Sequence, residues 1–266
     1  MVNFIPKIDK KISLEFEKTG YIIRHAANLK SLEKIRSIFI KSIKRNIKIN
    51  SKLKDSEILN SIHKVVKSKE LNNFRLKIIG EINRNKEIRK LYFDLAKPYL
   101  DILVGNELAM QLRLNLSIQL PEDSSSLLPI HSDVWSGDSP FEIVVWIPLV
   151  DCYSTKTMYI LPPNKMKKVN KIFLKSGKKS SGTIFNSIKK HVKWLNVKYG
   201  QILLFNQTLP HGNIVNREKE TRWSMNCRFK SVFTPYRDKK LGEFFEPITL
   251  RKISQLAINY NLPKLK

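Results

Sequence analysis

Two histidines and one aspartate in the second half of this sequence have the types and spacing of a metal site. A single residue separates His131 from Asp133, and His211 follows a strand-like segment and a proline. Residues two apart in a strand point to the same side, so His131 and Asp133 can face the same space. Two imidazoles and one carboxylate cover one face of an octahedral iron(II) and leave the other positions open. We therefore interpret His131, Asp133 and His211 as a candidate iron site.

The other possible ligands fit a metal site less well. Structural zinc usually takes four protein ligands and favours sulfur, but Cys152 and Cys227 show no metal-binding spacing. His25 and His63 lie in a region with helical periodicity, and His191 has no polar partner near it in the sequence. The two widely spaced cysteines indicate a reduced, cytoplasmic setting. A lone His-x-Asp is common by chance, so the distant third ligand carries the interpretation.

An arginine eleven residues after the second histidine has the chemistry to bind an anion. Arg222 begins the alternating segment RWSMNCRF, in which Arg222, Ser224, Asn226 and Arg228 share one face. A buried arginine needs an anionic partner, and its planar fork matches a carboxylate. We predict that Arg222 and Ser224 bind the distal carboxylate of 2-oxoglutarate. The alternative is a surface arginine paired with a nearby glutamate.

The segment HSDVWSGDSP continues from the candidate ligands into a loop that contains Trp135 and Asp138. Loops on a rigid scaffold commonly carry substrate contacts. A tryptophan face suits the C–H surface of a sugar, and Asp138 could accept hydrogen bonds from sugar hydroxyls. We therefore predict that Trp135 and Asp138 contact the substrate. The alternative is a loop packed by its own tryptophan.

Helical periodicity dominates the first part of the chain that must support this site. Residues 31–47 carry an apolar stripe at spacings of three and four, and further helical runs cover about 55–66, 69–83 and 86–104. We expect residues 1–104 to form a mainly helical region that packs on the rest of the chain.

The pattern changes to strands near residue 107. Residues 108–121 alternate as one strand, and 141–151 form an apolar run typical of a strand buried on both faces. Four more strand-like segments are expected at 157–163, 192–197, 200–206 and 222–233. Short strands with Pro and Gly turns predict a sandwich or jelly-roll barrel, here the core of residues 105–266. A basic insertion with one helical turn is expected at 165–182, and a terminal helix at 248–260. We expect both regions to pack as one structural domain.

The charge of the chain allows more than one reading. The net charge is +26, from 49 Lys and Arg against 23 Asp and Glu. Residues 101–150 have the opposite charge balance, because they contain seven Asp and Glu residues but a single Lys or Arg, which is Arg113. Compositional bias toward lysine, or an acidic partner or phosphate-bearing substrate, could each explain the excess. The acidic residues around the metal motif argue against binding of a nucleic acid there, because they would repel its phosphate backbone. No segment has the length or composition of a signal peptide or membrane span.

Taken together, these motifs resemble those of the iron(II)/2-oxoglutarate-dependent dioxygenases, in particular the branch similar to phytanoyl-CoA dioxygenase. The resemblance covers about residues 108–232 and rests on H-x-D, then G-x-x-L-L-F, P-H-G and an arginine eleven residues beyond. The segments VVWIPLVD, MYILPP and HSDVWSGDSP are similar to bacterial members found with genes for carbohydrate and surface-polysaccharide biosynthesis.

The resemblance implies an α+β protein with a double-stranded β-helix core, a helical N-terminal region and a C-terminal helix. It also implies iron(II) held by His131, Asp133 and His211, 2-oxoglutarate held by Arg222, and O₂ as co-reactant. The implied reaction hydroxylates or otherwise oxidises a small, carbohydrate-derived substrate, with 2-oxoglutarate converted to succinate. Asp133 favours oxidation over chlorination, because halogenases of this family carry a small residue at that position.

Two alternatives stay open. Arg228, six residues after Arg222, gives a spacing also seen in nucleic-acid base demethylases of the same superfamily, in which two arginines hold the two cosubstrate carboxylates. Such an enzyme would act on nucleic acid, which the basic charge also suggests. A non-catalytic jelly-roll binding module is the other alternative, in which His131-Ser132-Asp133 is only a polar strand end.

Overall fold

Antiparallel strands in two sheets form the centre of the computed structural model, which describes residues 4–49, 52–176 and 181–262. The strand order of the larger sheet is β1-β7-β4-β9-β2-β10, with β3 also beside β9, and that of the smaller sheet is β6-β5-β8. The larger sheet comprises β1 (Tyr21–His25), β2 (Leu108–Gln111), β3 (Asn115–Gln119), β4 (Glu142–Pro148), β7 (Gln201–Asn206), β9 (Arg222–Ser231) and β10 (Phe245–Pro247). The smaller sheet comprises β5 (Met158–Ile160), β6 (Lys193–Leu195) and β8 (His211–Gly212).

Strand β4 lies between β7 and β9, and both of its faces are buried. Val145 packs in the core shared with the helices, whereas Val144 and Trp146 pack in a second core that includes residues of the smaller sheet. The continuous apolar sequence of this strand follows from that position, because a strand covered on both faces has no solvent-facing side.

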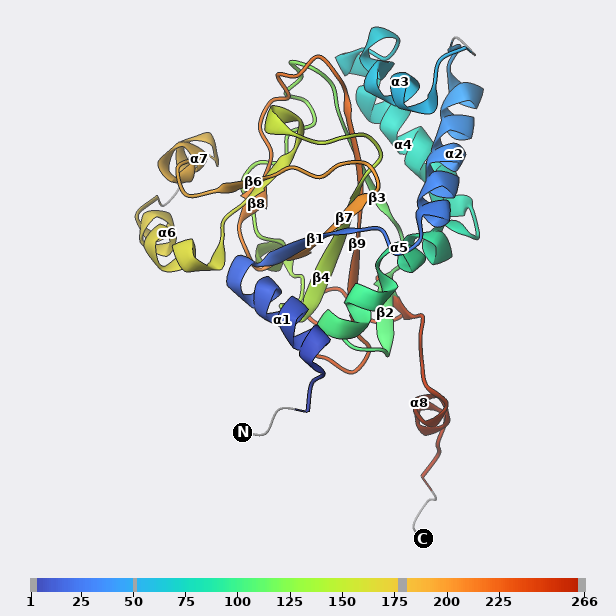
Figure 1. The fold of residues 1–266 in the computed structure, drawn as a ribbon, viewed down its shortest axis with the longest axis vertical. Helices are drawn as coiled ribbons and strands as arrows, with labels where there is room; N and C mark the ends of the chain where they lie inside the picture. Colours follow the sequence, from blue (N-terminus) through green and yellow to red (C-terminus); the bar gives the residue numbers. More distant parts are fainter. Residues whose placement is uncertain (1–3, 50–51, 177–180, 263–266) are drawn as a thin grey trace.

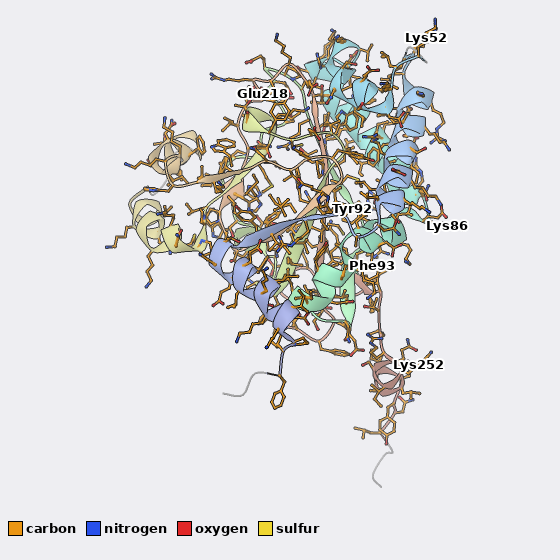
Figure 2. All side chains as sticks on the ribbon, viewed as in Figure 1. Lys52, Lys86, Tyr92, Phe93, Glu218 and Lys252 are labelled. Carbon is orange, nitrogen blue, oxygen red and sulfur yellow. The ribbon has the colours of Figure 1, made fainter. Side chains whose placement is uncertain are left out.

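A layer of helices covers one face of the larger sheet (Figure 1). Its members are α2 (Leu29–Asn46), α3 (Asp55–Asn60), α4 (Ser68–Arg84) and α5 (Ile88–Leu103). Tyr92 and Phe93 lie between α5 and the sheet, whereas Lys52 and Lys86 lie at the outer surface (Figure 2). The Tyr92 hydroxyl donates to the Val145 carbonyl at 2.8 Å, which ties α5 to β4.

The remaining helices lie outside this layer. They are α1 (Lys7–Thr19), α6 (Pro163–Ser176), α7 (Ser181–Ile188), α8 (Lys252–Ile258) and the short 3₁₀ helices Ile62–Lys64, Asp133–Ser136 and Ser154–Lys156. Helices α6 and α7 project at the edge of the molecule next to the smaller sheet (Figure 1). No described helix is long and apolar enough to cross a membrane.

The predicted combination of helices and antiparallel strands is confirmed, with differences in several elements. The mainly helical first part also contributes β1, which pairs with β7 from Tyr21↔Phe205 to His25↔Gln201. The predicted single strand at 108–121 is two strands, β2 and β3, with a bend between them. Asn83 of α4 fixes that bend, because its side-chain amide makes hydrogen bonds to both the N–H and the carbonyl of Leu114.

The basic insertion and the chain end also differ from the expectation. The insertion contains helices α6 and α7 rather than one helical turn, although residues 177–180 lie outside the described residues. Val169 and Ile188 of these helices are buried with Tyr159 of β5, so tertiary packing supports them. The terminal helix spans only Lys252–Ile258 and follows the short strand β10.

Candidate metal and cosubstrate site

The structure brings His131, Asp133 and His211 together, and their ligand atoms all lie within 4.8 Å of one another. His131 and His211 face each other across an antiparallel bridge, in which each backbone N–H donates to the other's carbonyl, at 3.0 and 2.8 Å. Their ring centroids are 4.3 Å apart. Oδ1 of Asp133 lies 3.6 Å from Nε2 of His131 and 3.9 Å from Nε2 of His211.

Both imidazoles are oriented by the backbone. Nδ1 of His131 lies 2.7 Å from the Pro129 carbonyl, and Nδ1 of His211 lies 2.9 Å from the Leu209 carbonyl. A carbonyl only accepts, so Nδ1 carries the proton in each ring and Nε2 offers its lone pair toward Asp133. Burial, and to a smaller extent the neighbouring His131, lowers the pKa of His211 from 6.5 to about 4. The His211 ring is therefore neutral at pH 7, as metal binding requires.

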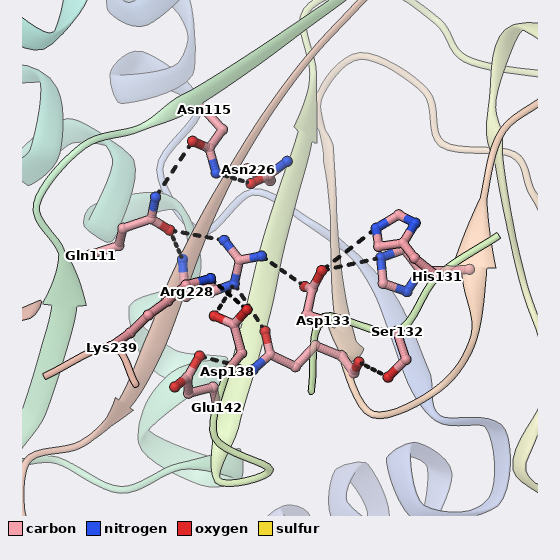
Figure 3. Close-up of polar contacts among 12 residues, drawn as sticks. Gln111, Asn115, His131, Ser132, Asp133, Asp138, Glu142, Asn226, Arg228 and Lys239 are labelled. Carbon is pink, nitrogen blue, oxygen red and sulfur yellow. Dashed lines mark hydrogen bonds and ion pairs between the residues drawn. The ribbon is translucent and has the colours of Figure 1, made fainter. Parts of the chain in front are cut away.

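Asp133 takes its direction from an extended residue before it and an arginine behind it. Ser132 points away from the ligands, and its hydroxyl donates to the carbonyls of Gln207 and Thr208, each at 3.0 Å. Oδ2 of Asp133 lies 3.0 Å from Nη2 of Arg228. Figure 3 shows the result, in which Arg228 and His131 lie on opposite sides of the Asp133 carboxylate. One carboxylate oxygen is thus left for a metal.

Arg228 belongs to a buried polar network behind Asp133 (Figure 3). Its Nε lies 3.1 Å from Asp138, whose other carboxylate oxygen lies 2.5 Å from Nζ of Lys239. The side-chain amide of Gln207 donates to Glu142 at 2.8 Å, and its oxygen accepts from Arg228 at 3.0 Å. The network fixes Arg228, and through it Asp133, because a buried polar group without its partner is costly.

A cavity of about 970 Å³ opens around these groups. Its lining comes from both sheets and from helix α4, and includes His131, Asp133, His211, Arg222 and Arg228. The site therefore lies between the sheets, where the short strand β8 presents His211 and the long strand β9 presents the arginines.

Arg222 is 2% exposed and has no carboxylate partner among the described residues. Its guanidinium donates to the Ser117 hydroxyl at 2.7 Å and to the Thr157 carbonyl at 3.3 Å. Its Nε and the buried hydroxyl of Ser224 find no hydrogen-bond partner in the described part of the chain. A buried cation of this kind is costly unless an anion completes it. The surface alternative is wrong, since Glu220 is instead 2.7 Å from Lys156.

The two predicted substrate contacts lie outside the cavity lining. Asp138 is 1% exposed and paired with Arg228 and Lys239, so it orders the network behind the ligands. Trp135 lies in the 3₁₀ helix Asp133–Ser136 and is 57% exposed. Neither position could be told from the sequence, because the path of the loop depends on contacts with distant segments such as Lys239.

The residues present fit iron(II) and 2-oxoglutarate. Two oriented imidazoles and one available carboxylate oxygen make a donor set typical of non-haem iron(II), and the buried Arg222 and Ser224 retain unused polar atoms for a carboxylate. Sequence reasoning missed the part of α4 that lines the same cavity, including Arg75, Gly80 and Arg84. No motif marks these residues, and their helix reads as an ordinary amphipathic segment.

Comparison with family models finds no match to this chain, and comparison with curated proteins finds none. Solved structures of similar fold include EctD from S. alaskensis with 2-oxoglutarate and 5-hydroxyectoine, at 14% identity and a TM-score of 0.57, covering 89% of this chain and 80% of EctD. The non-heme monooxygenase ThoJ matches at 13% identity with a TM-score of 0.55, covering 91% of this chain and 84% of ThoJ. SnoK, a non-heme α-ketoglutarate-dependent carbocyclase from nogalamycin biosynthesis, matches at 13% identity with a TM-score of 0.53. The match covers 88% of this chain and 87% of SnoK.

These similarities extend over most of each chain, so they concern the whole architecture rather than the motif region alone. At this level of identity they establish the fold, while the chemistry depends on the residues described above. The chain therefore has the fold of the non-heme enzymes that include EctD, ThoJ and SnoK, with a His-Asp-His cluster between its two sheets.

Proposed function

We propose that this protein is an iron(II)- and 2-oxoglutarate-dependent oxygenase whose two sheets are the halves of a double-stranded β-helix. The observation that carries the proposal is the convergence of His131, Asp133 and His211 with Arg222 in one cavity. Arg222 is a buried cation that lacks an anion among the described residues. A metal site alone would not require such a group, whereas a dicarboxylate cosubstrate would.

Each residue has a definite task in this proposal. Nε2 of His131, Nε2 of His211 and Oδ1 of Asp133 would hold the iron, and Arg222 with Ser224 would hold the distal carboxylate of 2-oxoglutarate. The chemistry that iron supplies when bound is activation of O₂, with 2-oxoglutarate leaving as succinate and CO₂. The protein orients the cosubstrate through Arg222 and positions Asp133 through Arg228, at 3.0 Å.

The oxidation outcome follows from the ligand set. Asp133 supplies a carboxylate where a chlorinating enzyme would leave a coordination position for chloride, so we propose hydroxylation or a related oxidation. We propose a small, carbohydrate-derived substrate on the basis of the sequence resemblance. Trp135, two residues after Asp133 and 57% exposed, stays the proposed apolar contact for it.

The pairing of Arg228 favours this function over the nucleic-acid demethylase. That alternative uses the second arginine to hold a cosubstrate carboxylate. In this structure Arg228 is engaged by Asp133 at 3.0 Å and by Asp138 at 3.1 Å. The convergence of the three ligands likewise disfavours a binding module in which the motif is only a strand end.

The test is anaerobic titration of the purified protein with Fe(II) and 2-oxoglutarate, followed by measurement of succinate after O₂ is admitted. We expect wild type and His25→Ala to bind both and to form succinate, because His25 is exposed on β1 away from the cavity lining. His131→Ala should lose Fe(II) binding and succinate formation. Equal binding of both ligands by His131→Ala and wild type would overturn the proposal.

A further inference from the structure

The cavity around the candidate iron site has a strong excess of positive charge. Among the residues that the structure describes, its lining contains five arginines and one carboxylate, that of Asp133. The arginines are Arg75, Arg84, Arg113, Arg222 and Arg228. Iron(II) and 2-oxoglutarate carry equal and opposite charges, so loading the site with both would leave this excess unchanged.

Two of the five arginines are accounted for by the site itself. Arg222 is assigned to 2-oxoglutarate, and Arg228 is paired with Asp133 and Asp138. The other three, which we call the rim arginines, are Arg75 and Arg84 of α4 and Arg113 in the bend between β2 and β3. They require a different explanation, because the iron and the cosubstrate do not use them.

The rim arginines have no carboxylate within 4 Å in the described part of the chain. Arg75 donates to the side-chain amide oxygen of Asn72 at 2.7 Å, which leaves its charge uncompensated. Glu81 lies on the same helix, and Arg84 contributes to its lowered pKa as the smallest of several causes, but the Glu81 carboxylate is hydrogen-bonded to Arg45 and Ser42 of α2, at 2.9 and 2.7 Å. The positive charge of the rim is therefore available to a ligand.

The fold links the backbone segments that carry two of these arginines. The side-chain amide of Asn83 accepts from the Leu114 N–H at 2.8 Å and donates to the Leu114 carbonyl at 3.0 Å. Arg84 directly follows Asn83, and Arg113 directly precedes Leu114. This double hydrogen bond therefore fixes the backbones that present Arg84 and Arg113 to the same cavity.

Helix α4 also leaves room for a ligand at this point. Gly80 lies in the helix and lines the cavity, and a Cβ placed there would meet only a terminal nitrogen of Arg84, at 3.8 Å. Glycine inside a helix costs about 0.5–1 kcal/mol relative to alanine. Its presence on the face turned to the cavity keeps that space open beside a guanidinium.

The acidic residues around the metal motif do not counter the charge of the rim arginines, contrary to the expectation from the sequence. Asp138 and Glu142 are buried at 1% and 4% exposure and take part in the network with Arg228 and Gln207. Asp123 accepts hydrogen bonds from Ser125. None of these three carboxylates lines the cavity.

We propose that the substrate is a small metabolite carrying a phosphate or carboxylate group, which Arg75, Arg84 and Arg113 bind at the rim. The inference rests on the proposed function for the assignment of Arg222 and the iron ligands. Guanidinium groups bind both anions through paired, charge-assisted hydrogen bonds. The cavity of about 970 Å³ lies within the range of about 300–1,000 Å³ for small-molecule sites, which favours a metabolite over a polymer.

The experiment measures binding to the metal-free protein by calorimetry, with glucose 6-phosphate, glucuronate, glucose and a single-stranded DNA dodecamer as separate probes. Metal-free protein separates the rim from the proposed iron chemistry. The rim variants are Arg75→Gln, Arg84→Gln and Arg113→Gln. Arg217→Gln is the matched control, because Arg217 is exposed and lies outside the cavity lining. Arg222→Gln separates the rim from the cosubstrate pocket.

We expect glucose 6-phosphate or glucuronate to bind and glucose not to bind, and the anion that binds identifies the group recognised. Each rim variant should weaken binding about tenfold or more, the usual effect of losing a charged hydrogen bond. Arg217→Gln should bind that anion as wild type does, whereas loss of binding in Arg222→Gln but not in the rim variants would place the anion in the cosubstrate pocket and contradict the inference. Gly80→Leu, which fills the space beside Arg84 without changing charge, should also weaken binding.

Three other results would overturn the inference: no binding of either sugar anion, equal weakening by Arg217→Gln, or binding of the oligonucleotide alone. The last result would instead assign the rim to nucleic acid. A failure of the proposed function has a different signature. In that case 2-oxoglutarate and Fe(II) would not bind, while the rim variants would still weaken binding of the sugar anion.

Discussion

The two carboxylate oxygens of Asp133 face different partners. Oδ1 lies 3.6 Å from Nε2 of His131, and Oδ2 lies 3.0 Å from Nη2 of Arg228. Arg228 is itself held by Asp138 and Gln207, at 3.1 and 3.0 Å. We infer that Arg228 fixes the rotation of the Asp133 carboxylate, so that a single oxygen is offered to the metal. Groups that orient a ligand in this way commonly affect metal affinity.

Replacing Arg228 by Gln should therefore weaken Fe(II) binding by about 10–100-fold, the usual effect of losing a group that orients a ligand. Anaerobic Fe(II) titration would measure the change, with Arg217→Gln as a control for loss of charge alone. An Fe(II) affinity equal to that of wild type would show that Asp133 keeps its orientation without Arg228.

A change at Arg222 should separate cosubstrate binding from metal binding. Arg222→Gln removes the buried guanidinium but leaves the three metal ligands in place. We expect 2-oxoglutarate to bind at least about 30-fold more weakly, since losing one partner of a buried ion pair costs about 2–5 kcal/mol. Fe(II) affinity should stay within about twofold of wild type. Calorimetry without O₂ measures both, and a parallel loss of Fe(II) would indicate structural damage instead.

The buried ring of His211 predicts a pH dependence of stability in the metal-free protein. Its pKa is lowered from 6.5 to about 4, so the unfolded chain binds the proton more tightly and stability falls as the pH falls from 6.5 toward 4. Between pH 7 and 5 the loss from this group is about 2 kcal/mol. Urea unfolding at the two pH values should show this loss of stability in wild type. In His211→Gln the free energy of unfolding should fall by about 2 kcal/mol less over the same pH range. Identical pH profiles would contradict the prediction.

At the scale of elements, helix α4 links the helical layer to the site. Asn83 fixes the bend between β2 and β3, and Gly80 lines the cavity between the two sheets. The sequence of this helix predicted only that it packs on the core, and α4 does so through buried residues such as Phe74 and Ile78. Its other face contributes to the wall of the cavity, so one amphipathic helix serves both the core and the site.

Gly80→Ala should stabilise the protein by up to about 1 kcal/mol, because a helical glycine is replaced where the added methyl meets only an arginine end at 3.8 Å. Gly105→Ala is the matched comparison, since its Cβ also meets open space but its φ of +121° is unfavourable for other residues. Chemical denaturation should therefore give opposite signs for the two substitutions. Equal signs would mean that backbone conformation does not decide the outcome at these positions.

At the scale of the whole molecule, one core joins the helical region to the larger sheet. Trp223 of β9 is fully buried between Phe39 and Phe74, whose ring centroids lie 6.5 and 6.1 Å from its own. Its indole N–H donates to the Leu59 carbonyl at 2.9 Å. We therefore predict that residues 1–104 and 105–266 fold as one domain, because neither would keep this core alone.

The prediction is tested by unfolding the chain in denaturant while helix content and tryptophan fluorescence are followed together. Both signals should change in one coincident transition. Trp223→Ala should lower the free energy of unfolding by about 3–5 kcal/mol. Both signals should then change at a lower denaturant concentration. Phe233→Ala is the control, because Phe233 is 60% exposed and should change stability by less than about 0.5 kcal/mol. Two separate transitions in wild type would instead indicate independent regions.

Local sequence patterns predicted most of the elements and the residues of the candidate site. The spacing of His131 and Asp133 and the alternation around Arg222 depend on backbone periodicity, which short segments already contain. His211 was identified by its place after a strand-like segment and a proline. The same patterns did not predict β1, because a five-residue edge strand is stabilised by its pairing with β7. Nor did they predict the bend that separates β2 from β3, which depends on Asn83 in a distant helix.

The sequence by itself determined which residues have metal-binding and anion-binding chemistry, since that property belongs to the side chain and its near neighbours. Only the tertiary structure decided which of them share a cavity. It buried Asp138 behind Asp133, left Arg222 without a carboxylate partner among the described residues, and placed Arg75, Arg84 and Arg113 in the lining of the same cavity. The physical reason is that burial and charge pairing depend on groups far apart in the chain, which no local pattern records.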